Sequence, residues 1–315
     1  MNEVAMKAIM YHYVRPFDDG FPNFKNLDVA DFHKQLDYFE DTFGFVSKED
    51  FLTSLRTGVP TPGVILTFDD GFKDHIAHVL PALEERGLWG IFYITTGVYQ
   101  KETLLDVHKI HLLLGKISSK EVFEAVQSQI SPKMLSHNTV DAFREATYKL
   151  QDNDDHTNLV KRTLNYYIDY VYRSQVIDAL MEQFFEETPS QLFRQFYLSE
   201  EELKRLHSAG MLVGSHTVSH PVMSKLNLME QHQEIENSFS FLEQTTGRIL
   251  TKTFCYPYGG FHTFTEDTRR LLNEAHVAFS FNVEPRDISE EDLSQHLQAL
   301  PRYDCNQFPH GSCRN

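Results

Sequence analysis

The chain has 315 residues, of which 41% are hydrophobic, so it can bury a sizeable core as one large α/β domain or two small ones. Its 29 Lys and Arg against 45 Asp and Glu give a formal net charge of −16. This charge argues against a general binder of nucleic acid or of anionic membranes, and plain solubility is its simplest explanation.

Cysteine usage and the N-terminus predict a cytoplasmic protein. The chain has three cysteines, Cys255, Cys305 and Cys313, and an odd number without paired spacing suggests reduced thiols. Residues Met1–Lys7 lack the apolar core of a signal peptide, and no segment approaches the ~18 apolar residues of a membrane span.

The first predicted elements are a strand and an amphipathic helix. Apolar residues at about Lys7–Tyr13 predict the strand, and polar loops follow it. The segment from about Val29 to Phe39 places Phe32, Leu36 and Phe39 on one helical face.

The next strand delivers two adjacent carboxylates. The run Val64–Phe68 consists of five β-formers and is followed by Asp69, Asp70 and Gly71. An α/β fold places its chemistry at such strand tips. Neighbouring carboxylates repel each other, so their pairing is tolerable if a cation neutralises one while the other works as a base. The alternative is a simple Asp-Gly turn.

A β-α-β rhythm continues beyond this point. A helix is predicted at Lys73–Arg86, kinked by Pro81 and ended by Gly87 in the C′ position. Trp89–Thr95 then returns as a strand. This order predicts a parallel sheet or barrel.

Residues from about 100 to 197 interrupt the rhythm and are predicted to be a helical insertion over the catalytic face of the barrel. Apolar residues recur at helical spacing in Glu121–Ile130 and Ser174–Glu187. The polar stretch 151–156 is interpreted as a solvated loop rather than a calcium site. The aromatic residues of the insertion form either a packed helical core or a sugar-stacking wall: Tyr166, Tyr167, Tyr170, Tyr172, Phe184 and Phe185.

The barrel pattern resumes with a capping box at Ser199 and Glu202, and a later strand leads to a histidine pair. His216 and His220 follow the apolar segment Met211–Ser215, and residues four apart lie on one face of a helical turn. Imidazoles spaced in this way can chelate a divalent metal, and catalytic zinc commonly takes three protein ligands. With 16 His in the chain, a chance pair is the alternative.

The last predicted elements surround an aromatic turn. A helix at about Met229–Thr245 precedes the strand that enters Phe254–Gly260, where the turn either holds a backbone N–H toward an oxyanion or is only a turn. A helix near Glu266–Ala275 leads into the strand Val277–Phe281.

The order of these elements resembles the polysaccharide deacetylase superfamily, carbohydrate esterase family four, of the NodB type. The first family motif is similar to Thr67–Gly71, the second to His216-Thr217-x-x-His220, and the third in part to Cys255–Gly259, where Cys255 stands in the place of a frequent Arg. The resemblance covers about residues 5–100 and 198–303. It implies a distorted (β/α) barrel, with residues 1–315 as one catalytic domain and a helical insertion at about 100–197.

The resemblance also implies roles for individual residues. Asp69 would be the general base, while Asp70, His216 and His220 would bind the metal, usually zinc. The backbone N–H of Tyr258 would help to hold the oxyanion.

Two further roles follow from a rearranged branch of the family, in which the strand that carries the general acid comes first. The chain opens with a Tyr11-His12 motif and has no Leu-x-His motif near its end, so His12 is assigned as the acid. Arg302 would replace the missing Arg and orient Asp69 through a charge-assisted hydrogen bond. The alternatives are a structural hydrogen bond for His12 and a surface ion pair for Arg302.

The resemblance therefore predicts metal-dependent N-deacetylation of an acetamido sugar, in particular of a cytosolic glycan or a nucleotide- or lipid-linked precursor. Alternatives are a metal-dependent hydrolase of another amide or ester and a non-catalytic carbohydrate-binding relative. A glycosidase would use two carboxylates but has no role for the histidine pair.

Overall fold

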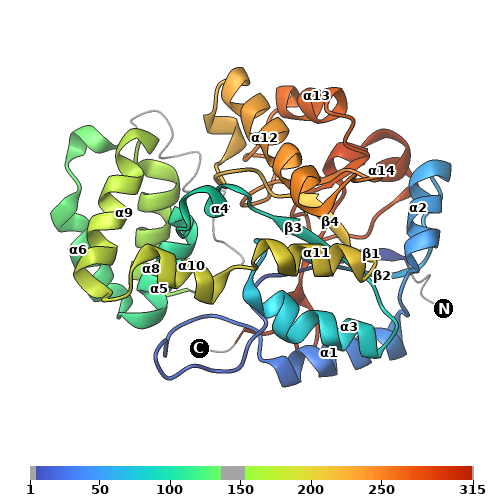
Figure 1. Ribbon diagram of the computed structural model, residues 1–315, viewed down its shortest axis with the longest axis horizontal. Coiled ribbons are helices and arrows are strands. Elements are labelled where there is room, and N and C mark those ends of the chain that lie inside the picture. The colour runs from blue at the N-terminus through green and yellow to red at the C-terminus, as the bar shows by residue number, and fades with distance from the viewer. Residues whose placement is uncertain (1–4, 136–152, 314–315) are drawn as a thin grey trace. The chain divides into compact units, whose positions relative to one another are not determined.

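Seven parallel strands form one sheet in the order β6-β5-β4-β3-β2-β1-β7. The structure, a computed structural model, describes residues 5–135 and 153–313. The strands are β1 (Met6–Tyr11), β2 (Gly63–Phe68), β3 (Gly90–Ile94), β4 (Leu212–Ser215), β5 (Thr253–Cys255), β6 (Phe279–Phe281) and β7 (Tyr303–Asp304) (Figure 1).

The sheet curls until one short segment joins its two edges. Leu300 forms a parallel bridge with Phe281 at the β6 edge, and the Asn282 N–H donates to the Leu300 carbonyl at 2.9 Å. A few residues later, β7 pairs with Ile9 and Met10 of β1. The predicted fold class, an α/β protein with a distorted barrel, is confirmed.

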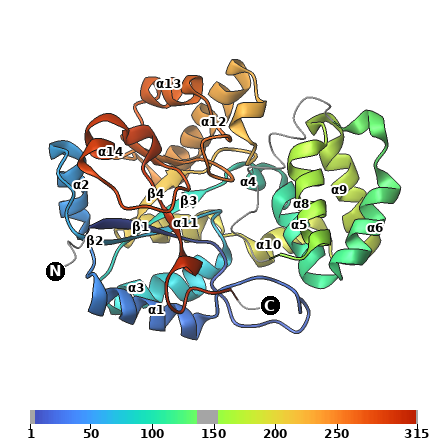
Figure 2. The ribbon, with the colours of Figure 1, turned by 180° about the vertical axis from the view of Figure 1, so that it is seen from behind.

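Alternation along the strands separates an inner from an outer apolar layer. Ala8, Ile65 and Tyr93 belong to the inner cluster. Ile9 and Leu66, which directly follow Ala8 and Ile65 in the chain, belong to the outer cluster. The outer layer is covered by helices, and Figures 1 and 2 show α1 and α3 side by side. The sheet belongs to a compact unit whose described residues are 5–16, 26–101 and 193–313. The α-helices of this unit are α1 (Val29–Thr42), α2 (Lys48–Thr57), α3 (Leu80–Glu85), α4 (Gly97–Lys101), α11 (Glu200–Ser208), α12 (Leu228–Thr246), α13 (Glu266–Glu274) and α14 (Glu290–Gln295).

The helix after β2 differs from the expected kinked α-helix. Residues His75–Val79 form a π-helical turn, and α3 begins only at Leu80. Because Pro81 has no N–H, the carbonyl four residues before it cannot be paired in the usual way. The wider turn accommodates this, since the Leu80 N–H donates to the His75 carbonyl five residues earlier.

A second compact unit consists of residues 17–25 and 102–192. Its aromatic residues divide between core and surface, since Tyr166 and Phe185 are buried while Tyr172 is half-buried. Asp154 caps a helix by accepting from the Thr157 N–H, which accounts for part of the polar stretch, and residues 151 and 152 lie outside the described residues. The helices are α5 (Asp106–Lys116), α6 (Ser119–Gln129), α8 (Asp155–Arg162), α9 (Tyr170–Phe184) and α10 (Pro189–Phe196), the last of which ends beyond this unit.

None of the helices within the described residues combines the length and apolar character that are needed to cross a membrane.

Candidate active site

The strand ends bring together residues that are far apart in the chain. His12, Asp69 and His216 lie just past the carboxyl ends of β1, β2 and β4. Because side chains alternate between the two faces of a strand, these three positions are on the same side as the inner apolar cluster. Tyr11 and Phe68 are paired in register, so His12 and Asp69 follow neighbouring strand ends. This is the edge at which barrel enzymes carry their active sites.

Asp70 reaches the same site by a left-handed backbone. In a continuing strand its side chain would point to the opposite face from that of Asp69. Instead Asp70 has a φ of 78°, which turns the chain as it leaves β2. Its Oδ1 lies 3.6 Å from Nε2 of both His216 and His220. Both carboxylates therefore serve one site from adjacent positions.

The two histidines lie on a loop, so the helical turn predicted for them is wrong. The His220 N–H donates to Oγ1 of Thr217 at 3.0 Å rather than to the carbonyl of His216. The carbonyls of Thr217 and Val218 accept from the chain that follows β3, at Thr96 and Gly97, so they are not available to a helix. Thr217 and His220 have φ values of 68° and 55°.

The tautomer of His216 follows from its hydrogen bond. Nδ1 lies 2.7 Å from the carbonyl oxygen of Cys255, which can only accept, so Nδ1 carries the proton and Nε2 presents its lone pair toward Asp70. Burial lowers the pKa of His216, and the charges of Asp69 and Asp70 oppose this only in part. The imidazole is therefore held in the neutral form that binds metals.

These donors fit a divalent metal ion. One ligand atom each from Asp70, His216 and His220 lies within 4.8 Å of the others, and all three residues are buried. Zinc bonds of about 2.1 Å in a tetrahedral arrangement separate two ligand atoms by about 3.4 Å. The observed 3.6 Å between Nε2 and Oδ1 is close to that separation and too long for a hydrogen bond.

Asp69 is bound by Arg302 rather than by the histidines. Nη1 and Nη2 of Arg302 donate to the two carboxylate oxygens at 2.8 and 2.7 Å, and Arg302 is 1% exposed. Burial raises the pKa of Asp69, but the charges of Arg302 and His216 and the hydrogen bonds from Arg302 outweigh burial and lower it. Asp69 is thus kept ionised and oriented.

Cys255 contributes a second combination of possible ligands, together with Asp69 and His216. Both oxygens of Asp69 are already occupied by Arg302. Burial raises the pKa of the Cys255 thiol well above its ordinary value, so the sulfur stays protonated beside the guanidinium, at 2.9 Å from Nη2. The set with Asp70 is therefore the better metal site.

His12 and Tyr258 lie at the edge of this cluster. His12 is half-buried, and its carbonyl oxygen is 3.0 Å from Nε2 of His75. The ring centroid of Tyr258 lies 4.8 Å from that of His220, and a φ of 65° turns the backbone at Tyr258. The structure thus brings all seven predicted site residues to one end of the sheet.

Two supporting residues were not singled out from the sequence. Thr67, two residues before Asp69 in the chain, accepts a hydrogen bond from Nη1 of Arg302 at 3.0 Å. Glu234 accepts from the backbone of the histidine loop. Thr67 stands within the first motif and could have been found there, whereas nothing in the sequence around Glu234 distinguishes it from other helix-surface carboxylates.

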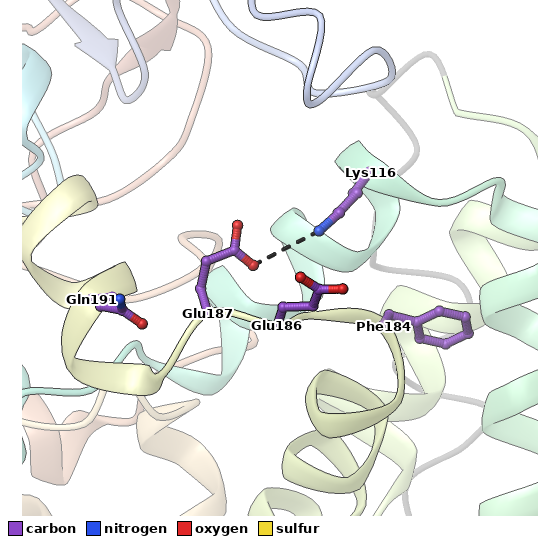
Figure 3. Close-up of a pocket in the computed structure, with 5 residues that line it drawn as sticks. All are labelled: Lys116, Phe184, Glu186, Glu187 and Gln191. Carbon is purple, nitrogen blue, oxygen red and sulfur yellow. Dashed lines mark ion pairs between the residues drawn. The ribbon is translucent and has the colours of Figure 1, made fainter.

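A separate hollow lies in the helical unit and contains none of these residues. It has a volume of about 470 Å³ and is lined by Lys116, Phe184, Glu186, Glu187 and Gln191 (Figure 3). The Lys116 ammonium and the Glu187 carboxylate form an ion pair at 3.8 Å. Its lining offers one ammonium and two carboxylates but no group of metal ligands like that at the strand ends, so we do not take it as the catalytic site.

Comparison with known proteins identifies related sequences and folds. The model of the polysaccharide deacetylase family matches residues 57–280. No curated protein matches the chain.

Solved structures share the fold at low sequence identity. The deacetylase PplD of Streptococcus pyogenes has a TM-score of 0.57 at 15% identity, with 96% of this chain and 92% of that chain covered. IcaB of Ammonifex degensii has a TM-score of 0.54 at 16% identity, with coverage of 95% and 91%. A polysaccharide deacetylase of Bacillus cereus has a TM-score of 0.54 at 13% identity, with coverage of 95% and 64%.

Proposed function

The chain belongs to the polysaccharide deacetylase family, and on this premise we propose that it is a metal-dependent hydrolase that removes the N-acetyl group from an acetamido sugar. One observation carries the proposal. Asp70, His216 and His220 converge at metal-binding spacing, and Asp69, paired with Arg302, lies beside them as a second carboxylate. This combination provides a metal site and a base in one buried cluster.

In this proposal Asp70, His216 and His220 hold one divalent ion, with zinc favoured by two imidazoles and one carboxylate. A bound ion of this kind polarises the acyl carbonyl and lowers the pKa of a water molecule toward neutrality. The protonated Nδ1 of His216, fixed by the Cys255 carbonyl, keeps Nε2 available as a ligand.

Asp69 acts as the general base that accepts the proton of the attacking water. Its two hydrogen bonds from Arg302 hold the carboxylate in one orientation and keep it ionised. A lowered pKa makes a carboxylate a weaker base, so we assign Arg302 a positioning role as well as an electrostatic one.

His12 acts as the general acid, since a protonated imidazole at the end of β1 can give its proton to the departing amine nitrogen. Its backbone is anchored by the contact between its carbonyl and His75. The backbone N–H of Tyr258 helps to hold the developing oxyanion, in a turn that is left-handed at Tyr258 and at Gly259.

We further propose one catalytic domain over residues 1–315 with a helical insertion at about 100–197, because the family match at 57–280 runs through that region. The three cysteines, Cys255, Cys305 and Cys313, are not joined by a disulfide, as in proteins of a reducing compartment. We therefore propose a cytoplasmic location and a glycan precursor, such as a nucleotide- or lipid-linked acetamido sugar, as the substrate.

The proposal is tested by acetate release from a panel of N-acetylated nucleotide sugars and oligosaccharides. We expect release from at least one member, loss of release with a chelator, and recovery when Zn²⁺ is added back. The same panel with O-acetyl esters and N-formyl amides is run in parallel.

Release that persists after the metal has been removed would contradict the metal-dependent mechanism. Turnover of only the esters or formamides would replace the N-deacetylase with another hydrolase. Sugar binding without release of any acyl group would leave a non-catalytic relative.

A further inference from the structure

The loop that carries the two histidines is held in an unusual backbone conformation. Thr217 and His220 both have left-handed φ values, which non-glycine residues adopt at a cost of about 1–3 kcal/mol each when nothing compensates. A loop of this kind keeps its shape only if surrounding groups hold it. The groups that hold it therefore determine where both imidazoles lie.

Glu234 of α12 binds the middle of this loop with one carboxylate. Its Oε2 accepts from the N–H groups of Val218 and Ser219 at 2.7 and 2.9 Å. Its Oε1 accepts from the Ser219 hydroxyl at 2.6 Å. Three donors thus converge on Glu234 from the two residues between Thr217 and His220.

Ser238, one helical turn further along α12, reaches the start of the same loop. Its hydroxyl donates to the Ile235 carbonyl at 2.7 Å, so in its 2.6 Å contact with Ser215 the Ser215 hydroxyl is the donor. Ser215 Oγ then accepts from the Thr217 N–H at 3.1 Å. The helix α12 packs against β4 (Figure 1). Glu234 and Ser238 of this one helix therefore bind two points of the loop.

We propose that Glu234 is a positioning residue for the metal site, acting through the backbone of the loop and touching neither the ion nor the substrate. The inference rests on the proposed function, because it takes His216 and His220 as metal ligands. An ionised carboxylate suits this position because it only accepts hydrogen bonds, and all three of its partners are donors.

A glutamine at position 234 removes this match while keeping the size of the side chain. Its amide has one acceptor oxygen and carries no charge, and its NH₂ group can face only the Ser219 hydroxyl, which would have to turn from donor to acceptor, because the Val218 and Ser219 N–H groups can only donate. In either orientation of the amide, the loop loses its charge-assisted hydrogen bonds, which are roughly twice as strong as neutral ones. Groups that orient metal ligands from outside the coordination sphere typically change affinity 10- to 100-fold when they are removed.

The test measures the dissociation constant for Zn²⁺, by competition with a chromophoric chelator, in the wild type and in Glu234→Gln. We expect the constant to rise about 10- to 100-fold in the variant. The matched control is Glu236→Gln, which makes the same change on the same helix about 200° away from Glu234 and should stay within about twofold of the wild type. Thermal unfolding of the metal-free proteins separates loss of positioning from loss of folding.

Unchanged Zn²⁺ affinity in a folded Glu234→Gln variant, with one ion bound by the wild type, would overturn the inference and leave the proposed function intact. A wild type that binds no Zn²⁺ would overturn both. If Glu234→Gln does not fold, Ser219→Ala decides the question, since it removes only the hydroxyl that donates to Oε1. We expect Ser219→Ala to weaken binding severalfold, and no change in that variant counts against the inference.

Discussion

Asp69 and Asp70 are adjacent in the chain but belong to different interactions. Asp69 accepts two hydrogen bonds from Arg302, whereas Asp70 faces the Nε2 atoms of the two histidines. The left-handed backbone at Asp70 makes this division possible, because a regular strand would send the two side chains to opposite faces. Two chemically identical groups therefore make different contacts.

This division predicts different effects for substitutions of the two aspartates. Asp69→Asn should lower kcat by about 10²- to 10⁴-fold, because the amide cannot accept a proton, and should leave the Zn²⁺ content near one ion per chain. Asp70→Asn is the matched neighbour and should lose the metal as well as activity. Turnover and elemental analysis on both proteins make the comparison. Wild-type turnover in Asp69→Asn would remove Asp69 from the role of base.

At the level of residues, the sequence motifs named the members of the site but not how they meet. The resemblance predicted roles for Asp70, His216 and His220, and the structure places these residues at metal-binding spacing. The expected helical turn is absent because the carbonyls of Thr217 and Val218 are bonded to the segment after β3. Such long-range pairing leaves no local pattern in the sequence, and the same holds for the contacts of Glu234.

At the level of elements, the carboxyl ends of the central strands determine where the proposed site residues lie. Strong apolar runs made β2 and the region of β3 predictable, because buried parallel strands are continuous in hydrophobicity. The short β7, with two residues, and the helix α2 were not predicted. The position of β7 depends on pairing with β1 across almost the whole chain, which local composition does not encode.

Gly214 tests how tightly β4 is packed before the histidine loop. A Cβ at this position would lie 2.7 Å from Cγ2 of Thr253, 2.7 Å from Cε1 of Tyr93 and 2.8 Å from the Thr253 carbonyl oxygen. Gly214→Ala should therefore lower the free energy of unfolding by about 1–3 kcal/mol.

Urea denaturation measures this change. Gly20→Ala is the control, since its Cβ would meet only the flexible Asp18 side chain, and it should stay within about 0.5 kcal/mol of the wild type. Equal stability of Gly214→Ala and the wild type would show that β4 can shift to accept a methyl group.

For the molecule as a whole, the site forms only when distant parts of the chain come together. His12, Asp69, His216, Tyr258 and Arg302 lie on segments that become neighbours through the sheet. A metal ion bound there would favour the folded state, by about 2.7 kcal/mol at a free concentration of 100 times its dissociation constant. Metal binding and closure of the curled sheet should therefore be thermodynamically coupled.

The most direct measurement is a crystal structure of the protein with Zn²⁺, with anomalous scattering recorded at the zinc edge. The account predicts one anomalous peak about 2.0–2.2 Å from Nε2 of His216, Nε2 of His220 and a carboxylate oxygen of Asp70. A fully ordered site without a peak, or a peak bound instead by Asp69 and Cys255, would contradict it.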